Sequence, residues 1–429
     1  MQGVKPYEIS KYLVLEAYHR VKQHRGGAGI DMVQLDDFDK NLKDNLYKIW
    51  NRMSSGCYFP PCVKLVEIPK SNGGKRPLGI PTVSDRIAQM VVVLSVENQI
   101  EPYFHKDSYA YRPGFNAKMA VAKAKERCWQ YNWVLDLDIS KFFDTIDHEL
   151  LMKAVHRHVE CKWALFYIER WLLVPYELSD GTRIERLSGV PQGSVIGPLL
   201  ANLFLHYVFD RWMQLNYPSI PFERYADDCV CHCRSKQESE NLLVQLQTRF
   251  EECHLKLNTE KTKLVYCKDS ARKEMHDSIS FDFLGFTFQP RKAVNKFKKS
   301  FTSFQPAISN KSMNRLREVM RSWNFKQRAD KSLEDLASII NNPIKGFINY
   351  YGAFRKSRLK QFLQELNFSI ARWVCNKYKR FRGKPLFKAV YWLGDIAHRQ
   401  PDLFAHWAYG VKPTSNMRSP KYGRIRRAV

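Results

Sequence analysis

The chain has 429 residues, of which 44% are hydrophobic and 13% aromatic, which is enough to bury more than one core and excludes a largely disordered protein. Its formal net charge is +26, and residues 291–429 carry 31 lysines and arginines against 7 acidic residues, so almost all of the excess lies in the last third. This excess predicts a phosphate-backbone partner, because aromatic residues are interleaved with the charges as in nucleic-acid grooves.

Between residues 1 and 290, the predicted elements alternate between helices and strands. In chain order we predict a helix over 7–23, a glycine loop over 26–29, a helix over 35–53, a basic β-hairpin over 64–80, buried helices over 81–100 and 116–131, a strand over 133–139, a helix over 199–212, a hairpin over 221–233, a helix over 236–253 and short strands over 264–266 and 281–288.

Beyond Pro290 the strand signals stop and helical spacing dominates. We predict helices over 311–323, 332–341, 343–355 and 357–380, packed as a bundle. The chain after residue 385 is expected to be short-segmented, with a basic tail over 421–427 that orders only on a ligand.

Targeting and cysteine signals point to a soluble, intracellular protein with no membrane partner. The first ten residues are polar, and no apolar run approaches 18 residues. The ten cysteines lack paired spacing, which indicates reduced thiols. Cys229, Cys231 and Cys233 share one face of a predicted strand, where we expect core packing rather than a metal site.

Three carboxylates carry the predicted chemistry. Asp138 ends a strand, and Asp227 with Asp228 forms the bend of a hairpin, so the three converge if the two segments pair in one sheet. Nucleotidyl transfer with two Mg²⁺ ions needs such a set, because Mg²⁺ takes hard oxygen ligands and leaves room for substrate phosphates. The alternative is that Asp227 and Asp228 are ordinary turn formers. Clustered carboxylates beside apolar strands repel one another unless cations neutralise them, which favours the metal site.

Four further residues fit a nucleotide. Lys70 and Arg76 flank the tip of the basic hairpin, where they could meet a triphosphate, although two solvated surface charges would look the same. Phe143 would place a ring near the sugar, where its bulk rejects a 2′-hydroxyl, and the alternative is a core ring. Gln192 offers an amide to the sugar or base, and the alternative is a simple turn.

Seven blocks of the sequence resemble the reverse-transcriptase blocks of group II intron-encoded proteins. In chain order they are EIPKSNGGKRPLGIPTVSDR, SYAYRPG, DLDISKFFDTIDH, GVPQGSVIGPLLANLFL, RYADD, LKLNTEKT and FLGF. The resemblance covers nearly the whole chain. The YADD motif alone is a weak signal of this family, whereas seven blocks in the family's order and spacing are a highly specific one. It implies an RNA-directed DNA polymerase of the α+β class. The expected architecture is a right-hand polymerase fold, with fingers and an antiparallel palm sheet, followed by an all-α thumb or maturase bundle and a basic C-terminal region.

The resemblance also implies a domain layout. Residues 1–60 would form an N-terminal extension with a glycine-bearing loop, 61–290 the fingers and palm, 291–380 the thumb or maturase domain that binds intron RNA, and 381–429 a basic region like the start of a DNA-binding region. The paired cysteines and HNH-type motif of the endonuclease found in many members do not occur before Val429. This departure suggests a lineage that inserts without second-strand cutting, although a shortened chain would look the same.

Carried over residue by residue, the resemblance makes Asp138, Asp227 and Asp228 the catalytic and metal-binding aspartates. The backbone carbonyl of Ile139 is an added ligand for two Mg²⁺ ions. The expected dNTP contacts are Lys70, Arg76, Phe143, Gln192 and Ala226. The expected RNA contacts are Arg25, Arg112, Lys345, Arg355, Lys356, Arg372, Lys379 and Arg380.

The implied partners are group II intron RNA, an RNA template with a DNA or RNA primer, dNTPs and a DNA target, with no membrane. We expect a cytoplasmic bacterial ribonucleoprotein, nucleoid-associated when it acts on DNA, that promotes splicing as a maturase and returns the intron to DNA by retrohoming. Two alternatives stay open: a splicing maturase whose polymerase activity has decayed, which the intact aspartates argue against, and a domesticated or defence-linked reverse transcriptase.

Overall fold

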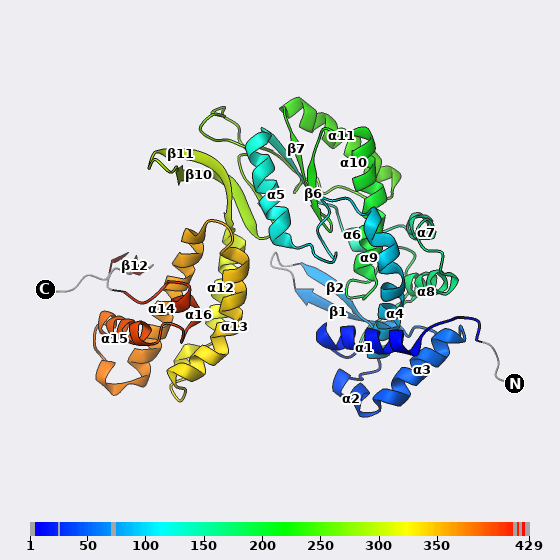
Figure 1. Cartoon of the computed structure of the whole chain (residues 1–429), viewed down its shortest axis with the longest axis horizontal. Coiled ribbons are helices and arrows are strands. Elements are labelled where there is room, and N and C mark those ends of the chain that lie inside the picture. The colour runs from blue at the N-terminus through cyan, green and yellow to red at the C-terminus, as the bar shows by residue number, and fades with distance from the viewer. Residues whose placement is uncertain (1–4, 25, 70–73, 415–417, 420–422, 425–429) are drawn as a thin grey trace. The chain divides into compact units, whose positions relative to one another are not determined.

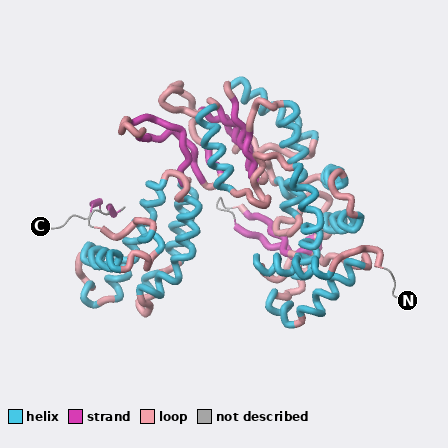
Figure 2. Tube along the Cα trace, in the orientation of Figure 1, coloured by secondary structure: helices cyan, strands magenta, loops and turns pink. Residues whose placement is uncertain are grey.

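A computed structural model of the chain describes residues 5–24, 26–69, 74–414, 418–419 and 423–424 (Figures 1 and 2). The chain divides into two compact units. The first unit contains residues 1–120 and 133–264, and the second contains residues 121–132 and 265–429. Each unit is described by itself below.

The first unit combines helices with two four-stranded sheets. Its elements, including α5 and β8, which continue into the second unit, are α1 Lys11–His24, α2 Leu35–Lys40, α3 Leu42–Ser54, β1 Val63–Pro69, β2 Lys75–Ile80, α4 Val83–Ile100, η1 Glu101–Tyr103, α5 Ala117–Gln130, β3 Trp133–Leu137, α6 Phe142–Thr145, α7 His148–His156, α8 Lys162–Leu173, β4 Tyr176–Glu177, β5 Arg183–Ile184, α9 Gly197–Leu205, η2 His206–Asp210, α10 Arg211–Asn216, β6 Phe222–Tyr225, β7 Asp228–Cys233, α11 Lys236–Glu252 and β8 Lys263–Tyr266.

The sheet that carries the predicted aspartates has the strand order β6-β7-β3-β8. Strand β7 lies between β6 and β3 and pairs antiparallel with both. Cys229, Cys231 and Cys233 on β7 are almost fully buried, which confirms that they belong to a core face. The other sheet has the order β2-β1-β4-β5, and β1 with β2 forms the predicted hairpin.

Helix α4 is the central helix of the first unit. It is apolar on most of its surface, and it contacts α1, α3, α8 and α9. Its buried Asp85 accepts hydrogen bonds from Tyr58, Trp171 and Gln89. The Gln89 side-chain oxygen accepts in turn from the backbone N–H of Val195 at 2.8 Å. A chain of buried polar groups therefore ties the core helix to the turn that precedes α9.

The predicted helix over 199–212 is interrupted by a π-helical segment, η2, between α9 and α10. Such π-bulges place one extra residue in a helix and re-aim the side chains that follow. Here the segment ends at Asp210, which is completely buried beside the sheet that carries the aspartates.

The second unit joins a three-stranded sheet, ordered β11-β10-β9, to a helical region with one continuous core. Figure 1 shows β10 and β11 as a long ribbon reaching away from α12, α13 and α14. The elements that lie wholly in this unit are β9 Phe281–Phe283, β10 Phe286–Val294, β11 Ser300–Ile308, α12 Asn310–Ser322, η3 Phe325–Gln327, α13 Leu333–Tyr351, α14 Lys356–Lys377, η4 Lys379–Phe381, α15 Leu386–Arg399, α16 Ala405–Ala408, β12 Arg418–Ser419 and β13 Gly423–Arg424.

The α+β class with a strand-bearing core followed by a helical region is confirmed, and four details of the prediction are wrong. Strands do not stop at Pro290, because β10 runs to Val294 and β11 follows. The predicted helix over 35–53 is two helices that meet at Asn41. One helix, α13, runs through Pro343, because Ile340 and Ile344 on either side are anchored in the core. The region after residue 385 contains the 14-residue helix α15.

A membrane-crossing helix would need a longer apolar stretch than any helix has in the part of the chain that the structure describes.

Candidate active site

Six of the predicted site residues line one cavity of about 460 Å³ in the first unit. They come from four separate segments of the chain, so the fold brings together what the sequence keeps apart. They are Arg76, Asp138, Ile139, Phe143, Gln192 and Asp227. Asn258 and Lys261, which the sequence analysis did not single out, line the same cavity.

Asp138 directly follows β3 and is fixed through its backbone. Its N–H donates to the Thr262 hydroxyl at 3.4 Å, and its carbonyl accepts from the Asn258 N–H at 2.8 Å. The Asp138 carboxylate pairs with the Lys261 ammonium at 3.1 Å. Lys261 belongs to the LKLNTEKT block, so that block was the available signal for it, although no single residue of the block had been assigned a role.

Asp227 lies in the two-residue turn between β6 and β7. Tyr225 pairs with Asp228 across the turn, and Ala226 adopts φ +57, a left-handed conformation that is unfavourable for a residue with a Cβ. Burial, with the charge of Asp138 as a further cause, raises the pKa of Asp227 above its ordinary value. Two carboxylates therefore share one partly closed space, and a cation between them would relieve their repulsion.

A buried network underneath holds the strained turn. The Arg224 guanidinium is completely buried and donates to both Asp210 oxygens, at 2.7 and 2.6 Å. The same guanidinium donates to Asn202 at 2.9 Å and to the carbonyl of Ala226 at 3.3 Å. The charge of Asp210 keeps the pKa of Arg224 raised although burial alone would lower it. The sequence analysis missed this network. Its visible signals were the arginine of RYADD and the asparagine of GVPQGSVIGPLLANLFL, Asn202, whereas Asp210 lies outside all seven blocks.

A glycine contact fixes Gln192 beside the β1–β2 hairpin. The Gly79 N–H donates to the Gln192 carbonyl at 2.8 Å, and a Cβ at Gly193 would come within 2.3 Å of the Gly79 carbonyl oxygen. With φ +110, position 193 therefore requires glycine. The Gln192 side chain accepts a hydrogen bond from Arg76, which joins the two predicted nucleotide-contacting side chains directly.

Phe143 faces the cavity, whereas its neighbour Phe142 is buried in the core. The Phe143 carbonyl accepts from the Val190 N–H at 2.7 Å. A Cβ on Gly189, which has φ +82, would lie 2.8 Å from that carbonyl oxygen. The backbone of Phe143 is therefore held against a turn that requires glycine at position 189.

The third predicted carboxylate, Asp228, is exposed at the start of β7 and does not line the cavity. Leu137 and Cys229 form the last described pair between β3 and β7, so Asp138 and Asp228 follow it on adjacent strands. Among the described residues, no group of three or more His, Cys, Asp and Glu side chains is close enough to hold a metal ion by itself. The donor set still fits a hard divalent cation, because carboxylates and a backbone carbonyl surround the cavity and substrate phosphates can complete a Mg²⁺ shell.

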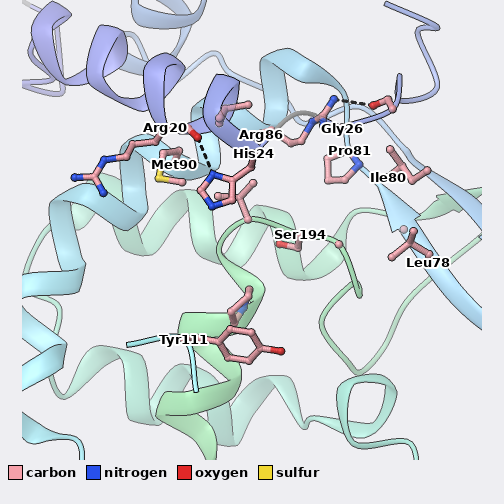
Figure 3. A pocket seen from close by; sticks show the side chains of 16 residues that line it. Arg20, His24, Gly26, Leu78, Ile80, Pro81, Arg86, Met90, Tyr111 and Ser194 are labelled. Atoms are coloured by element: carbon pink, nitrogen blue, oxygen red, sulfur yellow. Dashed lines mark hydrogen bonds between the residues drawn. The ribbon is translucent and has the colours of Figure 1, made fainter. Parts of the chain in front are cut away.

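A second cavity of about 510 Å³ is lined by both Gly79 and Gly193. Figure 3 shows Arg20 and His24 on one side of it and Tyr111 on the other. Arg86 donates to the carbonyl of Gly27 at 2.8 Å, which ties the glycine loop to α4. Its buried Nε has no hydrogen-bond partner within the described structure.

The remaining predicted contacts are dispersed. Lys70 and Arg25 lie outside the described residues, and Ala226 is 7% exposed. The Arg112 side chain is 6% exposed and pairs with Glu101 at 2.8 Å, which gives it a structural role in its loop. The predicted RNA contacts in the second unit are exposed, apart from the half-buried Arg355; the exposed ones are Lys345, Lys356, Arg372, Lys379 and Arg380.

Residues 68–288 match the family described as reverse transcriptase (RNA-dependent DNA polymerase). The chain belongs to the reverse transcriptase family. Residues 313–392 match the group II intron, maturase-specific domain. This reverse transcriptase is therefore an RNA-directed DNA polymerase of the group II intron-encoded kind, with a maturase domain that binds intron RNA.

The chain is similar to several proteins, one of which is described as a group II intron-encoded protein. The reverse transcriptase is 32% identical to protein YkfC of Escherichia coli over 56% of this chain and 73% of that protein. It is 24% identical to the group II intron-encoded protein LtrA of Lactococcus lactis over 85% and 72% of the two chains. It is 25% identical to the putative COX1/OXI3 intron 2 protein of Saccharomyces cerevisiae over 63% of this chain and 30% of that protein. A solved structure of telomerase from Candida albicans covers 88% of this chain and 68% of its own at 11% identity, with a TM-score of 0.45, which is too low to carry an argument.

Proposed function

We propose that the carboxylate cavity performs nucleotidyl transfer of dNTPs onto a primer 3′-hydroxyl. Asp138, Asp227 and Asp228, with the Ile139 carbonyl, would hold two Mg²⁺ ions. When bound, these ions supply charge neutralisation of the phosphates and acidify the attacking hydroxyl. The observation that supports this assignment is the convergence of Asp138 and Asp227 in one cavity with Arg76, Gln192 and Phe143.

The residues around the carboxylates are assigned by their contacts. Arg76 pairs with the triphosphate and is oriented for this by its hydrogen bond to Gln192. Phe143 occupies the space of a ribose 2′-hydroxyl, so that deoxynucleotides are preferred. Lys261 orients Asp138, and Arg224 holds the Ala226 carbonyl so that Asp227 stays directed into the cavity.

The domain layout serves both activities in this proposal. Residues 61–290 would polymerise, and residues 291–380 would bind intron RNA, with 1–60 and 381–429 adding contacts to template and to target DNA. The second cavity would take the template strand, because its lining residues Leu78 and Gly193 are chain neighbours of Pro77 and Gln192 in the cavity assigned to the nucleotide. Arg20 and Arg86 supply the positive charge there. We further propose that the protein supports retrohoming of its intron into a DNA target.

Primer extension tests the polymerase assignment. A DNA primer on an RNA template, with dNTPs and Mg²⁺, should give full-length product, and chelation by EDTA should abolish it. RNA binding measured on the same preparation provides the control. A protein that binds RNA tightly but extends no primer would instead support the splicing maturase with decayed polymerase activity.

A further inference from the structure

The hairpin β10–β11 lies largely between the two family matches. Residues 289–312 belong to neither the reverse-transcriptase match nor the maturase match. Beyond Phe288 the strand β9 ends, so the pairs from Gln289–Gln305 to Val294–Ser300 form a two-stranded ribbon. Such ribbons are only marginally stable by themselves in water. A ribbon of this length without a core of its own points to a binding role.

The base of the ribbon is anchored within the second unit. The Trp129 indole donates to the carbonyl of Phe304 at 2.8 Å, and the Thr302 N–H donates to the Ser270 hydroxyl at 2.7 Å. Both guanidinium nitrogens of Arg355 donate to the carbonyl of Lys292 at 3.2 Å. The stem is therefore fixed to the N-terminus of α14, and the tip extends beyond these anchors.

The tip combines exposed apolar side chains with cations. Phe297 is 71% exposed and Val294 61%, so the tip offers an aromatic ring and an aliphatic side chain to a partner. The Lys296 ammonium lies 5.0 Å from the Phe297 ring centre. Lys298 and Lys299 are also exposed. An aromatic ring flanked by lysines matches the way proteins stack on unpaired bases while they pair with phosphates.

The ribbon and the start of α12 lie in a stretch of the chain that has no acidic residue. The sequence contains no Asp or Glu between Asp282 and Glu318. Burial, together with the charges of Arg355 and Arg358, lowers the pKa of Arg291 to about 10. The first turn of α14 also lacks acidic residues, although cations at a helix N-terminus oppose the helix dipole. Crowded cations of this kind are stabilised by an anion such as phosphate.

We propose that the β10–β11 ribbon and the first turn of α14 form one RNA-binding surface, in which Phe297 stacks on an unpaired base. Lys298, Lys299 and Lys356 pair with the phosphates on either side of that base. The proposal rests on RNA binding by this maturase and extends it to a hairpin that neither family match covers.

The charge of the tip is tested on the full chain with a labelled synthetic stem-loop RNA, by measuring Kd at several salt concentrations. The variant Lys298→Ala/Lys299→Ala should weaken binding and flatten the slope of log Kd against log salt by about 1.4, since each phosphate contact on a single strand contributes about 0.7. The matched control, Arg321→Ala/Lys326→Ala, removes the same charge from exposed positions of the same unit and should keep the slope. Equal slopes in the two variants would overturn the assignment.

The stacking is tested separately. Phe297→Ala should weaken binding of the stem-loop about 5- to 150-fold, the range expected for one lost base stack, and leave the slope unchanged. Phe297→Tyr keeps the ring and should restore affinity. A blunt duplex of the same stem offers no unpaired base, so an equal loss on the duplex would refute stacking. Primer extension on a short template should stay at the wild-type rate in all these variants, which separates this test from that of the polymerase site.

Discussion

The buried pair of Arg224 and Asp210 offers a sharp test of how the aspartate turn is held. Both side chains have no exposed surface, and their two charge-assisted bonds measure 2.7 and 2.6 Å. Arg224→Met leaves a carboxylate buried without its cation, which costs about 3–5 kcal/mol. With Arg224 in place, His206, whose Nδ1 lies 3.9 Å from Asp210, does not supply the cation at pH 7, because burial lowers its pKa to about 4. For a unit of this size the Tm should fall by about 6–20 °C.

The double variant Arg224→Met/Asp210→Leu separates stability from positioning. Removing both charges leaves no buried unpaired charge, and only the oxygens of Asn202 and Ala226 lose a donor, so most of the lost stability should return. Nucleotide addition should remain about 100-fold slow, because no side chain then holds the carbonyl of Ala226. The loss should appear in kcat at saturating dNTP rather than in KM, since the turn orients a carboxylate and does not bind the base.

Differential scanning fluorimetry and single-nucleotide addition measure these two quantities. The matched control is Glu223→Leu/His232→Leu, which removes another fully buried pair, 2.6 Å apart, from β6 and β7. The His232–Glu223 hydrogen bond does not involve the residues of the turn. The control variant should therefore add nucleotides at the wild-type rate. A wild-type rate in the Arg224→Met/Asp210→Leu variant would refute the positioning role of Arg224.

Three further predictions concern single residues. Asp227→Asn should abolish synthesis while the Kd for RNA stays within about twofold, because one metal ligand is lost and the basic surface is unchanged; surviving synthesis in a primer-extension assay would contradict the site. Phe143→Ala should raise ribonucleotide incorporation about tenfold or more in a competition with dNTPs, and an unchanged preference would rule out a steric gate. His406, fully buried, has its pKa lowered to about 3 by burial, so the unfolded chain takes up a proton below pH 6.5 that the folded chain does not. Stability should therefore be lost as pH falls from about 6.5 to about 3, by about 1.4 kcal/mol per pH unit at most, and urea midpoints should show a flatter pH dependence in His406→Gln.

The sequence by itself determined the local elements and the chemistry-bearing residues. Alternation around Asp138 predicted a strand, and the strand signals on either side of Asp227 predicted a hairpin bend, because side-chain periodicity is a local property of the backbone. The resemblance of seven blocks was enough to predict the family that the comparisons then confirmed. Which residues touch substrate stays a prediction.

The tertiary structure decided what depends on contacts between distant segments. Arg224 is an ordinary charged residue in the sequence. Only the fold shows that it is buried against Asp210, the last residue of the π-helical segment η2. Packing of Ile340 and Ile344 carries α13 through Pro343 against its local preference. Strand β11 is stabilised by pairing with β10 along its whole length. The sequence pattern within residues 300–308 did not predict this strand. Burial and pairing energies arise from neighbours far away in the chain, so local periodicity does not contain them.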